Sequence, residues 1–195
     1  MSAHIPWPKG KENADKWPVY IEVGKGANGI LVEGYLTTII KTSGVHVVGV
    51  MLDADINPKG RYSRVRALCA TLFPAMPKDI PATGLIVDND NDQRLGVWIM
   101  PDNVSEGTLE TFLKHLVPDD SKPIWDHGLE SFAKAKEMGA PCRDCHDQKA
   151  SMFTWLAWQD PPGQNAGHAL TRRILDPRAA SATPFVNWFR ELYRL

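Results

Sequence analysis

The feature that most constrains the fold is the predominantly apolar run VHVVGVML, residues 45–52, which ends directly on the acidic stretch DAD, residues 53–55. The run lacks the alternation of polar and apolar residues that a half-exposed strand would show. Such a run is typical of a strand that is covered on both faces in a parallel sheet. Parallel strands need long crossover connections, which are usually helices, so the run predicts an α/β protein.

The segments around this run predict alternating strands and helices. The expected strands are residues 18–22, 45–52, 84–87 and 95–100, with expected helices at 28–43 and 61–72. From residue 105 onward, apolar side chains recur every three or four positions and predict helices at 108–117, 123–138, 148–159, 168–175 and 184–193. We therefore expect three parts: an N-terminal arm (1–17), an α/β core with a mainly parallel sheet (18–117), and a helical extension packed on it (118–195).

Charge and hydropathy exclude some classes of protein. The net charge of −1 excludes a chain whose whole surface attracts nucleic acid, so any such contact must be local. No apolar run reaches the length of about 18 residues that a membrane-spanning helix needs, and we expect no membrane contact. The N-terminal stretch is polar and rich in proline and lacks the apolar segment of a signal peptide. We therefore expect a cytoplasmic protein.

The acidic candidates lie at the ends of the first, second and last expected strands. Glu22 ends the first, Asp53 and Asp55 end the second, and Asp102 follows the last. Ligands of open α/β sheets bind at the carboxyl ends of the strands, where these residues lie. Residues two apart in an extended segment face the same side, so Asp53 and Asp55 are expected to point together at one hard cation. Mg²⁺ or Mn²⁺ fits such a pair, because Mg²⁺ commonly binds one or two carboxylates together with substrate phosphates.

Basic residues follow the acidic stretch in the segment NPKGRYSRVR, residues 57–66. The next helix begins there, and its positive dipole end favours anions. A phosphate contact is therefore one interpretation of the basic side chains, and a solvated helix face is the other. The candidates for phosphate binding are Lys59, Arg61, Arg64 and, farther along the chain, Lys149.

A glutamate after the first strand, then a helix, then an apolar strand ending in D-x-D resembles the Toprim domain of topoisomerases, primases and OLD-type nucleases. The stretches LDAD, LGVWIMPDN, GTLETFL and KASMFTWLAWQDPPG are more similar to a family of small, stand-alone bacterial Toprim-like proteins of uncharacterised function. This resemblance extends from about residue 19 to residue 195. We match the glutamate of the family to Glu22. Glu33 is the other candidate, but it lies only 53 − 33 = 20 residues before Asp53, too few for a helix and a strand between them.

The resemblance implies a Rossmann-like, Toprim-like fold and magnesium-dependent phosphoryl transfer. Glu22 would then serve as a general acid or base or as a further metal ligand, Asp53 and Asp55 would hold the ion, and Asp102 is a further catalytic candidate. The implied function is a nuclease-like enzyme acting on nucleic acid or a nucleotide. The alternative is a non-catalytic Toprim-like subunit that binds a partner protein such as an ATPase. The stretch EVGKGA, residues 22–27, departs from the glycine and acidic residue that often follow this glutamate, which leaves catalysis open.

The stretch CRDCH, residues 142–146, matches the C-x-x-C-H signature of c-type haem attachment. Haem attachment requires an exported compartment, for which the sequence contains no signal segment. Zinc is the other metal-based interpretation, with Cys142, Cys145 and His146 as ligands and His168 or His127 as the fourth. The simplest alternative is a loop between helices that carries two thiols.

Two tryptophans lie three residues apart in the stretch FTWLAWQDPPG, on one face of an expected helix. Trp155 and Trp158 can either pack in a core or stack on nucleic-acid bases. We expect both to pack between the helical layer and the sheet.

Overall fold

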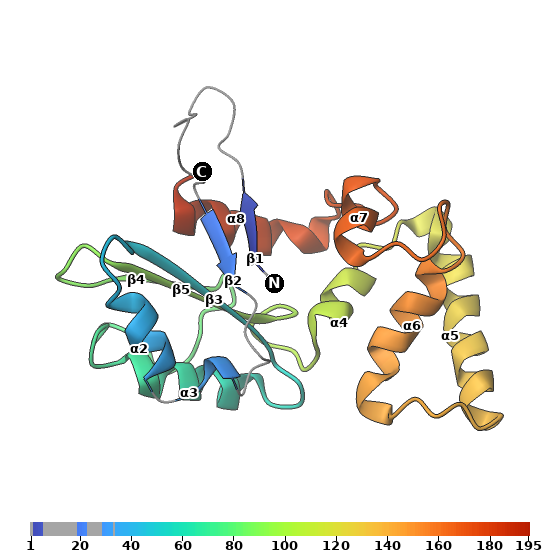
Figure 1. Ribbon diagram of the computed structural model, residues 1–195, viewed down its shortest axis with the longest axis horizontal. Helices are drawn as coiled ribbons and strands as arrows, with labels where there is room; N and C mark the ends of the chain where they lie inside the picture. The colour runs from blue at the N-terminus through green and yellow to red at the C-terminus, as the bar shows by residue number, and fades with distance from the viewer. Residues whose placement is uncertain (1, 6–18, 23–28, 33) are drawn as a thin grey trace. The chain divides into compact units, whose positions relative to one another are not determined.

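The computed structural model describes residues 2–5, 19–22, 29–32 and 34–195 (Figure 1). The chain divides into two compact units. The first contains residues up to Glu106 together with Phe185–Leu195, and the second is Gly107–Pro184. The extension predicted at 118–195 is therefore shared between the units, because its last helix belongs with the first unit. Residues 107–117, which we expected in the α/β core, belong to the second unit.

The first unit contains a three-stranded mixed sheet in the order β3 (Val47–Asp53), β5 (Arg94–Met100), β4 (Leu85–Asp88). β3 and β5 are parallel, whereas β4 is antiparallel to β5. The α/β class is confirmed. The sheet is mixed rather than mainly parallel, because the short loop at residues 89–93 joins β4 and β5 as a hairpin, and a hairpin connects antiparallel strands.

The strand predicted at residues 18–22 is present as β2 (Val19–Glu22), but it does not join the sheet of β3. It pairs antiparallel with β1 (Ser2–Ile5) in a separate two-stranded sheet. Sequence order alone suggested that consecutive strands would be neighbours, whereas strand pairing is decided by contacts distant in the sequence. The remaining residues of the predicted N-terminal arm, and Glu33, lie outside the described part of the chain.

Helices cover both faces of the three-stranded sheet. α2 (Tyr35–Ile40) and α3 (Pro58–Cys69) lie on one side and α8 (Thr183–Tyr193) lies on the other (Figure 1). α3 starts three residues earlier than predicted, because Asn57 caps it by accepting a hydrogen bond from Gly60 N at 2.8 Å and Pro58 suits the first helical position. The core beneath α2 and α3 consists of buried aliphatic and aromatic residues, among them Leu36, Ile40, Val50, Leu52, Tyr62, Val65, Leu95, Val97 and Ile99.

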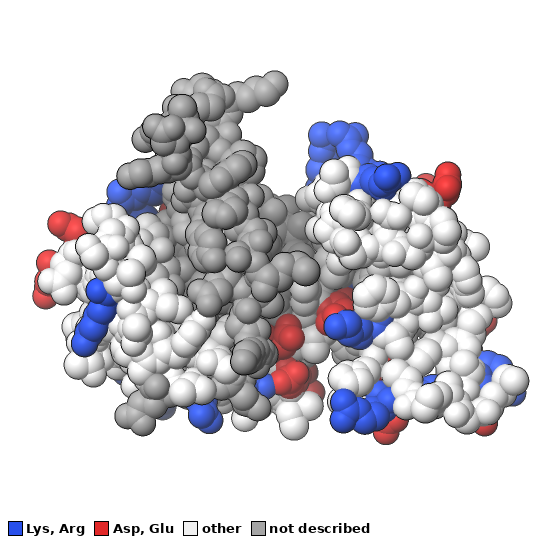
Figure 2. Space-filling view, in the orientation of Figure 1, with Lys and Arg blue, Asp and Glu red and all other residues white. Residues whose placement is uncertain are grey.

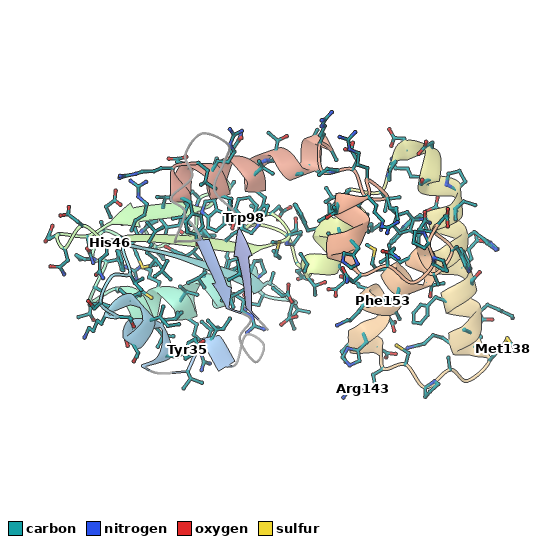
Figure 3. All side chains as sticks on the ribbon, turned by 45° about the horizontal axis from the view of Figure 1, so that its top comes forward. Tyr35, His46, Trp98, Met138, Arg143 and Phe153 are labelled. Carbon is teal, nitrogen blue, oxygen red and sulfur yellow. The ribbon has the colours of Figure 1, made fainter. Side chains whose placement is uncertain are left out.

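α8 packs on the opposite face of the sheet through aromatic residues. Trp188 is buried, and its indole Nε1 donates to the carbonyl of Leu85 in β4 at 2.9 Å. Trp98 of β5 contacts Phe185 and Trp188, with ring centroids at 5.4 and 5.5 Å (Figure 3). The apolar stripe that predicted this helix is therefore the face that closes the core of the first unit.

The second unit is helical in its described residues. Its elements are α4 (Leu109–Lys114), η1 (Asp119–Ser121), α5 (Lys122–Glu137), η2 (Asp144–His146), α6 (Asp147–Leu156), α7 (Ala166–Thr171) and η3 (Ala180–Ala182). α5 and α6 pack together around Trp125 and Trp155, whose ring centroids are 5.7 Å apart. No helix in the described part of the chain has both the length and the apolar character of a membrane span.

The two tryptophans of α6 and the turn after it differ in burial. Trp155 has no exposed surface, so it is a core residue as predicted, but it packs against Trp125 within the second unit and not between the helices and the sheet. Trp158 is 46% exposed and stacks on His127 of α5, with ring centroids at 5.5 Å. The prediction that both tryptophans are core residues is therefore wrong for Trp158, because it lies beyond the end of α6 and its ring lies over the surface of α5.

Candidate functional site

The carboxyl ends of β3 and β5 lie side by side at one edge of the sheet. The two strands are parallel and in register, with Asp53 opposite Met100. The pairing continues one residue further, because Ala54 N donates to Met100 O at 3.1 Å. Asp53 ends β3 and Asp102 follows β5 by two residues, so the structure brings both acidic loops to the same edge.

Asp55 does not continue the strand that contains Asp53. Its φ of 50° is left-handed, so the rule that residues two apart in a strand face the same side does not apply to this pair. The Asp55 carboxylate forms an ion pair with Arg61 of α3. Arg61 Nε also donates to the backbone carbonyl of Asp53 at 3.1 Å. The Arg61 guanidinium therefore links the carbonyl of Asp53 to the carboxylate of Asp55, and it neutralises the charge of that carboxylate.

Asp102 lies in a turn that its own carboxylate stabilises. Its Oδ1 accepts hydrogen bonds from Val104 N at 3.0 Å and Ser105 N at 2.6 Å, and its Oδ2 accepts from Ser105 Oγ at 2.8 Å. This is the behaviour of an aspartate in an Asx turn.

Glu22 is the last residue of β2, in the two-stranded sheet. Strand pairing therefore does not bring it to the edge where Asp53 lies, as a single parallel sheet would have done. The side chain of Glu22 lies outside the described part of the structure. Its role as an acid, base or metal ligand stays a prediction.

The four predicted phosphate contacts have different surroundings. Arg61 is bound to Asp55, and Arg64 donates to the backbone carbonyl of Leu31 at 3.4 Å. Lys59 is exposed in the first turn of α3 and makes no ion pair with the described residues. Lys149 is exposed on α6, in the second unit. Among these four predicted contacts, Lys59 is thus the cation of the first unit that is most available to an anion.

The carboxylates at this edge of the sheet are the type of ligand that a hard cation prefers, but they are too few to surround the ion by themselves. Carboxylate oxygens are preferred by Mg²⁺, and the ion commonly keeps several water ligands. Within the described residues, no three His, Cys, Asp or Glu side chains are grouped so that they could hold a metal ion together. Among the described residues, Asp53 and Asp102 would offer two carboxylates, and an ion bound there would take its remaining ligands from water and a phosphate.

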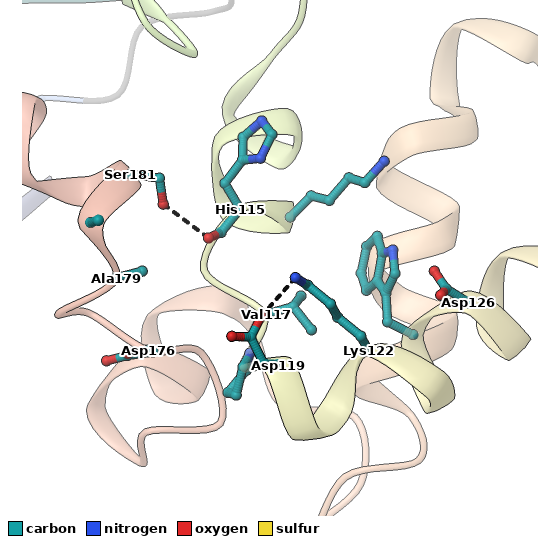
Figure 4. Close-up of a pocket in the computed structure, with 12 residues that line it drawn as sticks. His115, Val117, Asp119, Lys122, Asp126, Asp176, Ala179 and Ser181 are labelled. Atoms are coloured by element: carbon teal, nitrogen blue, oxygen red, sulfur yellow. Dashed lines mark hydrogen bonds and ion pairs between the residues drawn. The ribbon is translucent and has the colours of Figure 1, made fainter.

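A second candidate site is a pocket of about 440 Å³ within the helical unit (Figure 4). The C-terminal part of α4, the start of α5 and the segment before α8 form its walls. Lys122 and Asp119 form an ion pair at 2.7 Å, and a hydrogen bond from Lys122 lowers the pKa of the Asp119 carboxyl. Ser181 Oγ donates to His115 O at 2.9 Å. Lysines and aspartates both line the pocket, so its charges select neither anions nor cations, and no sequence motif pointed to it.

The surface charge of the molecule gives little support to broad nucleic-acid binding. Figure 2 shows Lys and Arg side chains on both units, interspersed with Asp and Glu. On the described residues of the face shown, the basic side chains do not merge into one continuous surface. A phosphate backbone would therefore be bound at local cations such as Lys59.

The stretch CRDCH forms the loop between α5 and α6 and the short helix η2. Cys142 is half-buried and Cys145 is exposed, and both are free thiols. His146 Nε2 lies 2.8 Å from an Nη2 atom of Arg143, and a guanidinium can only donate, so this nitrogen is the acceptor. The nitrogen is thus already engaged, and no described side chain completes a metal-binding group with the two thiols.

Comparison with known protein families finds one match. The model of a family described as "Protein of unknown function (DUF3226)" matches residues 2–194, nearly the whole chain. No curated protein and no solved structure matches the chain.

Proposed function

This chain belongs to the DUF3226 family of proteins of unknown function, and we propose its function from its own residues together with the Toprim resemblance: it is a magnesium-dependent, Toprim-like phosphoryl-transfer protein of the nuclease type. The observation that carries the proposal is the parallel pairing of β3 with β5, which brings Asp53 and the loop of Asp102 to one edge of the sheet. Ligands of α/β sheets bind at this edge.

Each residue at the edge has a part in the proposal. Asp53 and Asp102 are the proposed ligands of Mg²⁺, and Lys59 in the first turn of α3 attracts a phosphate of the substrate. When bound, the ion would neutralise charge on the phosphate and lower the pKa of a bound water. Arg61 holds Asp55 in an ion pair, so Asp55 joins the site only if Arg61 turns to the phosphate instead. The role of Glu22 as a general acid or base rests on the Toprim resemblance alone.

The first prediction concerns metal binding. Calorimetric titration with Mg²⁺ and with Mn²⁺ should show binding by the native protein and loss of the binding heat in the Asp53→Asn, Asp102→Asn double variant, because both proposed carboxylate ligands are removed. Asp90→Asn is the matched control. It removes one exposed carboxylate from the β4–β5 loop, at the opposite end of β5, and should leave binding unchanged.

A cleavage assay on plasmid and single-stranded DNA with the same proteins separates binding from catalysis. Metal-dependent cleavage that disappears in the double variant and persists in Asp90→Asn supports phosphoryl transfer. If the native protein and the double variant bind the ion equally, Asp53 and Asp102 are turn residues and the proposed site is wrong.

A non-catalytic subunit that binds a partner protein, such as an ATPase, is the second candidate. The observation that favours it is a pair of exposed aliphatic side chains next to the acidic loops: Ile56 is 82% exposed and Val104 is 65% exposed. Aliphatic side chains at this exposure suit a protein contact better than a phosphate backbone. Metal binding without cleavage by the purified chain would favour this candidate, and cleavage by the chain alone would exclude it.

A further inference from the structure

Two of the three cysteines are accessible and lie three positions apart. Cys145 is exposed and Cys142 is half-buried, in the segment that connects α5 to α6 (Figure 3, near Arg143). The third, Cys69, has no exposed surface in the core of the first unit, and burial raises the pKa of its thiol to about 11. The proposed phosphoryl-transfer site makes no use of these thiols, so the pair requires a separate explanation.

A single lysine anchors the loop that carries the thiol pair. Lys136 Nζ donates to the carbonyl of Cys142 at 3.0 Å, to Asp144 Oδ1 at 2.6 Å and to Asp147 Oδ1 at 3.1 Å. The hydrogen bonds to Asp144 and Asp147 raise the pKa of the Lys136 ammonium, and the bond from Lys136 lowers the pKa of Asp144. The ammonium thereby contacts the backbone of Cys142 and two carboxylates, one before and one after Cys145 in the sequence.

The residues between the thiols form a tight turn. His146 N donates to Arg143 O at 2.8 Å, and the residues from Asp144 onward are helical. The side chains of Arg143 and His146 contact each other through Nη2 and Nε2. Lys136 therefore fixes the loop from one side and the Arg143–His146 contact closes the turn, while the thiol of Cys145 stays exposed.

We propose that Cys142 and Cys145 are a redox-active dithiol that exchanges with low-molecular-weight disulfides. Two intervening residues is the spacing of the cysteine pairs in thiol–disulfide oxidoreductases. A disulfide between residues only three positions apart closes a short loop, which favours a bond within the chain over two separate adducts. This activity is independent of the proposed metal site.

The exchange proceeds in two balanced steps. The thiolate of Cys145, the exposed residue, attacks one sulfur of a disulfide such as oxidised glutathione; a mixed disulfide forms and one glutathione thiolate leaves. The thiolate of Cys142 then attacks the sulfur of Cys145, the second glutathione leaves, and the bond between Cys142 and Cys145 closes. The two cysteines lose two electrons and two protons in total, and the disulfide is reduced to two thiols.

The test is equilibration of the reduced full-length protein with mixtures of reduced and oxidised glutathione, followed by alkylation and mass spectrometry of the intact chain and of its peptides. We expect the native protein to lose two hydrogens and to yield one cross-linked peptide joining Cys142 and Cys145. Cys142→Ser should instead accumulate a glutathione adduct on Cys145, because the second step is blocked. Cys69→Ser is the matched control and should form the disulfide as the native protein does.

Three results would overturn the proposal. The first is a native protein that carries glutathione on both thiols without an internal bond. The second is alkylation of Cys142 and Cys145 no faster than that of buried Cys69 in the folded protein. The third is a disulfide that forms only after unfolding, which circular dichroism of each sample detects.

Cys145 is exposed, so its serine variant should fold and should show little glutathione on Cys142.

Discussion

One buried asparagine shapes the loop that carries Asp102. Asn103 is 3% exposed and has a left-handed φ of 70°. Its Oδ1 accepts from Ile99 N at 2.7 Å and its Nδ2 donates to Ala82 O at 3.2 Å, so the side chain satisfies the backbone where β5 ends. The Asn103 side chain therefore fixes the backbone of the loop in which Asp102 lies.

Asn103→Ala should lower the free energy of unfolding by about 2 kcal/mol or more, because a buried Ile99 N–H loses its acceptor and alanine enters a left-handed conformation. Urea unfolding measures the change. Asn91→Ala, in the exposed β4–β5 loop, is the control and should change stability by less than about 0.5 kcal/mol. Equal effects of the two substitutions would show that Asn103 has no special structural role.

The pairing of Asp55 with Arg61 is the other decisive contact at this scale. An exposed ion pair contributes about 1 kcal/mol or less to stability, so this contact matters more for where the carboxylate points than for the fold. It competes directly with metal binding by Asp55. The proposed site therefore depends mainly on Asp53 and Asp102.

At the scale of elements, two glycines decide how closely α8 approaches the sheet. Gly49 of β3 and Gly96 of β5 are directly opposite each other. A Cβ added at Gly96 would lie 2.5 Å from Leu192 Cδ2 and 3.0 Å from Trp188 Cζ2. Leu192 has no exposed surface, so it cannot move aside without disturbing the core.

Gly96→Ala should therefore destabilise the protein by about 1–3 kcal/mol, because the added methyl group overpacks the contact between β5 and α8. Gly128→Ala in α5 is the matched control. There the nearest atom would be at 3.6 Å, an ordinary contact, and alanine favours a helix by about 0.5–1 kcal/mol. Thermal or urea unfolding should show opposite signs for the two variants, and a neutral Gly96→Ala would mean that α8 packs less closely.

At the scale of the whole molecule, the last segment of the chain belongs to the first unit, although the second unit precedes it in the sequence. Residues 185–195 follow the helical unit directly in sequence, yet they belong to the unit that contains the sheet. The fold of the first unit therefore depends on a helix that begins 83 residues after the end of β5 (183 − 100). The two units are linked twice by the chain.

Trp188→Ala should lower the stability of the first unit by about 3–5 kcal/mol, since it empties a buried aromatic site and removes the hydrogen bond to Leu85. Hydrogen exchange should show lost protection in β3 and β5, with α5 and α6 unchanged. Val186→Ala, at a 38% exposed position of the same helix, is the control and should leave protection in both units unchanged. Loss of protection in α5 and α6 alone would contradict the assignment of α8 to the first unit.

The sequence by itself determined the type and approximate position of most local elements. The apolar run at 45–52 predicted β3, and apolar side chains recurring every three or four positions predicted α8. The CRDCH spacing also identified the pair of thiols as a separate feature, whereas the exposure of Cys145 is known only from the structure. These patterns depend on residues a few positions apart, whose conformational preferences act locally.

Only the tertiary structure decided which elements pair and which side chains meet. The sequence does not reveal that the strand of Glu22 forms a separate sheet, that Asp55 binds Arg61, or that α8 closes the first unit. Strand pairing and helix docking depend on surfaces that become neighbours after folding, and many pairings satisfy the same local preferences. The acids at the ends of β3 and β5 were visible in the sequence, but their common edge follows from the parallel register of the two strands.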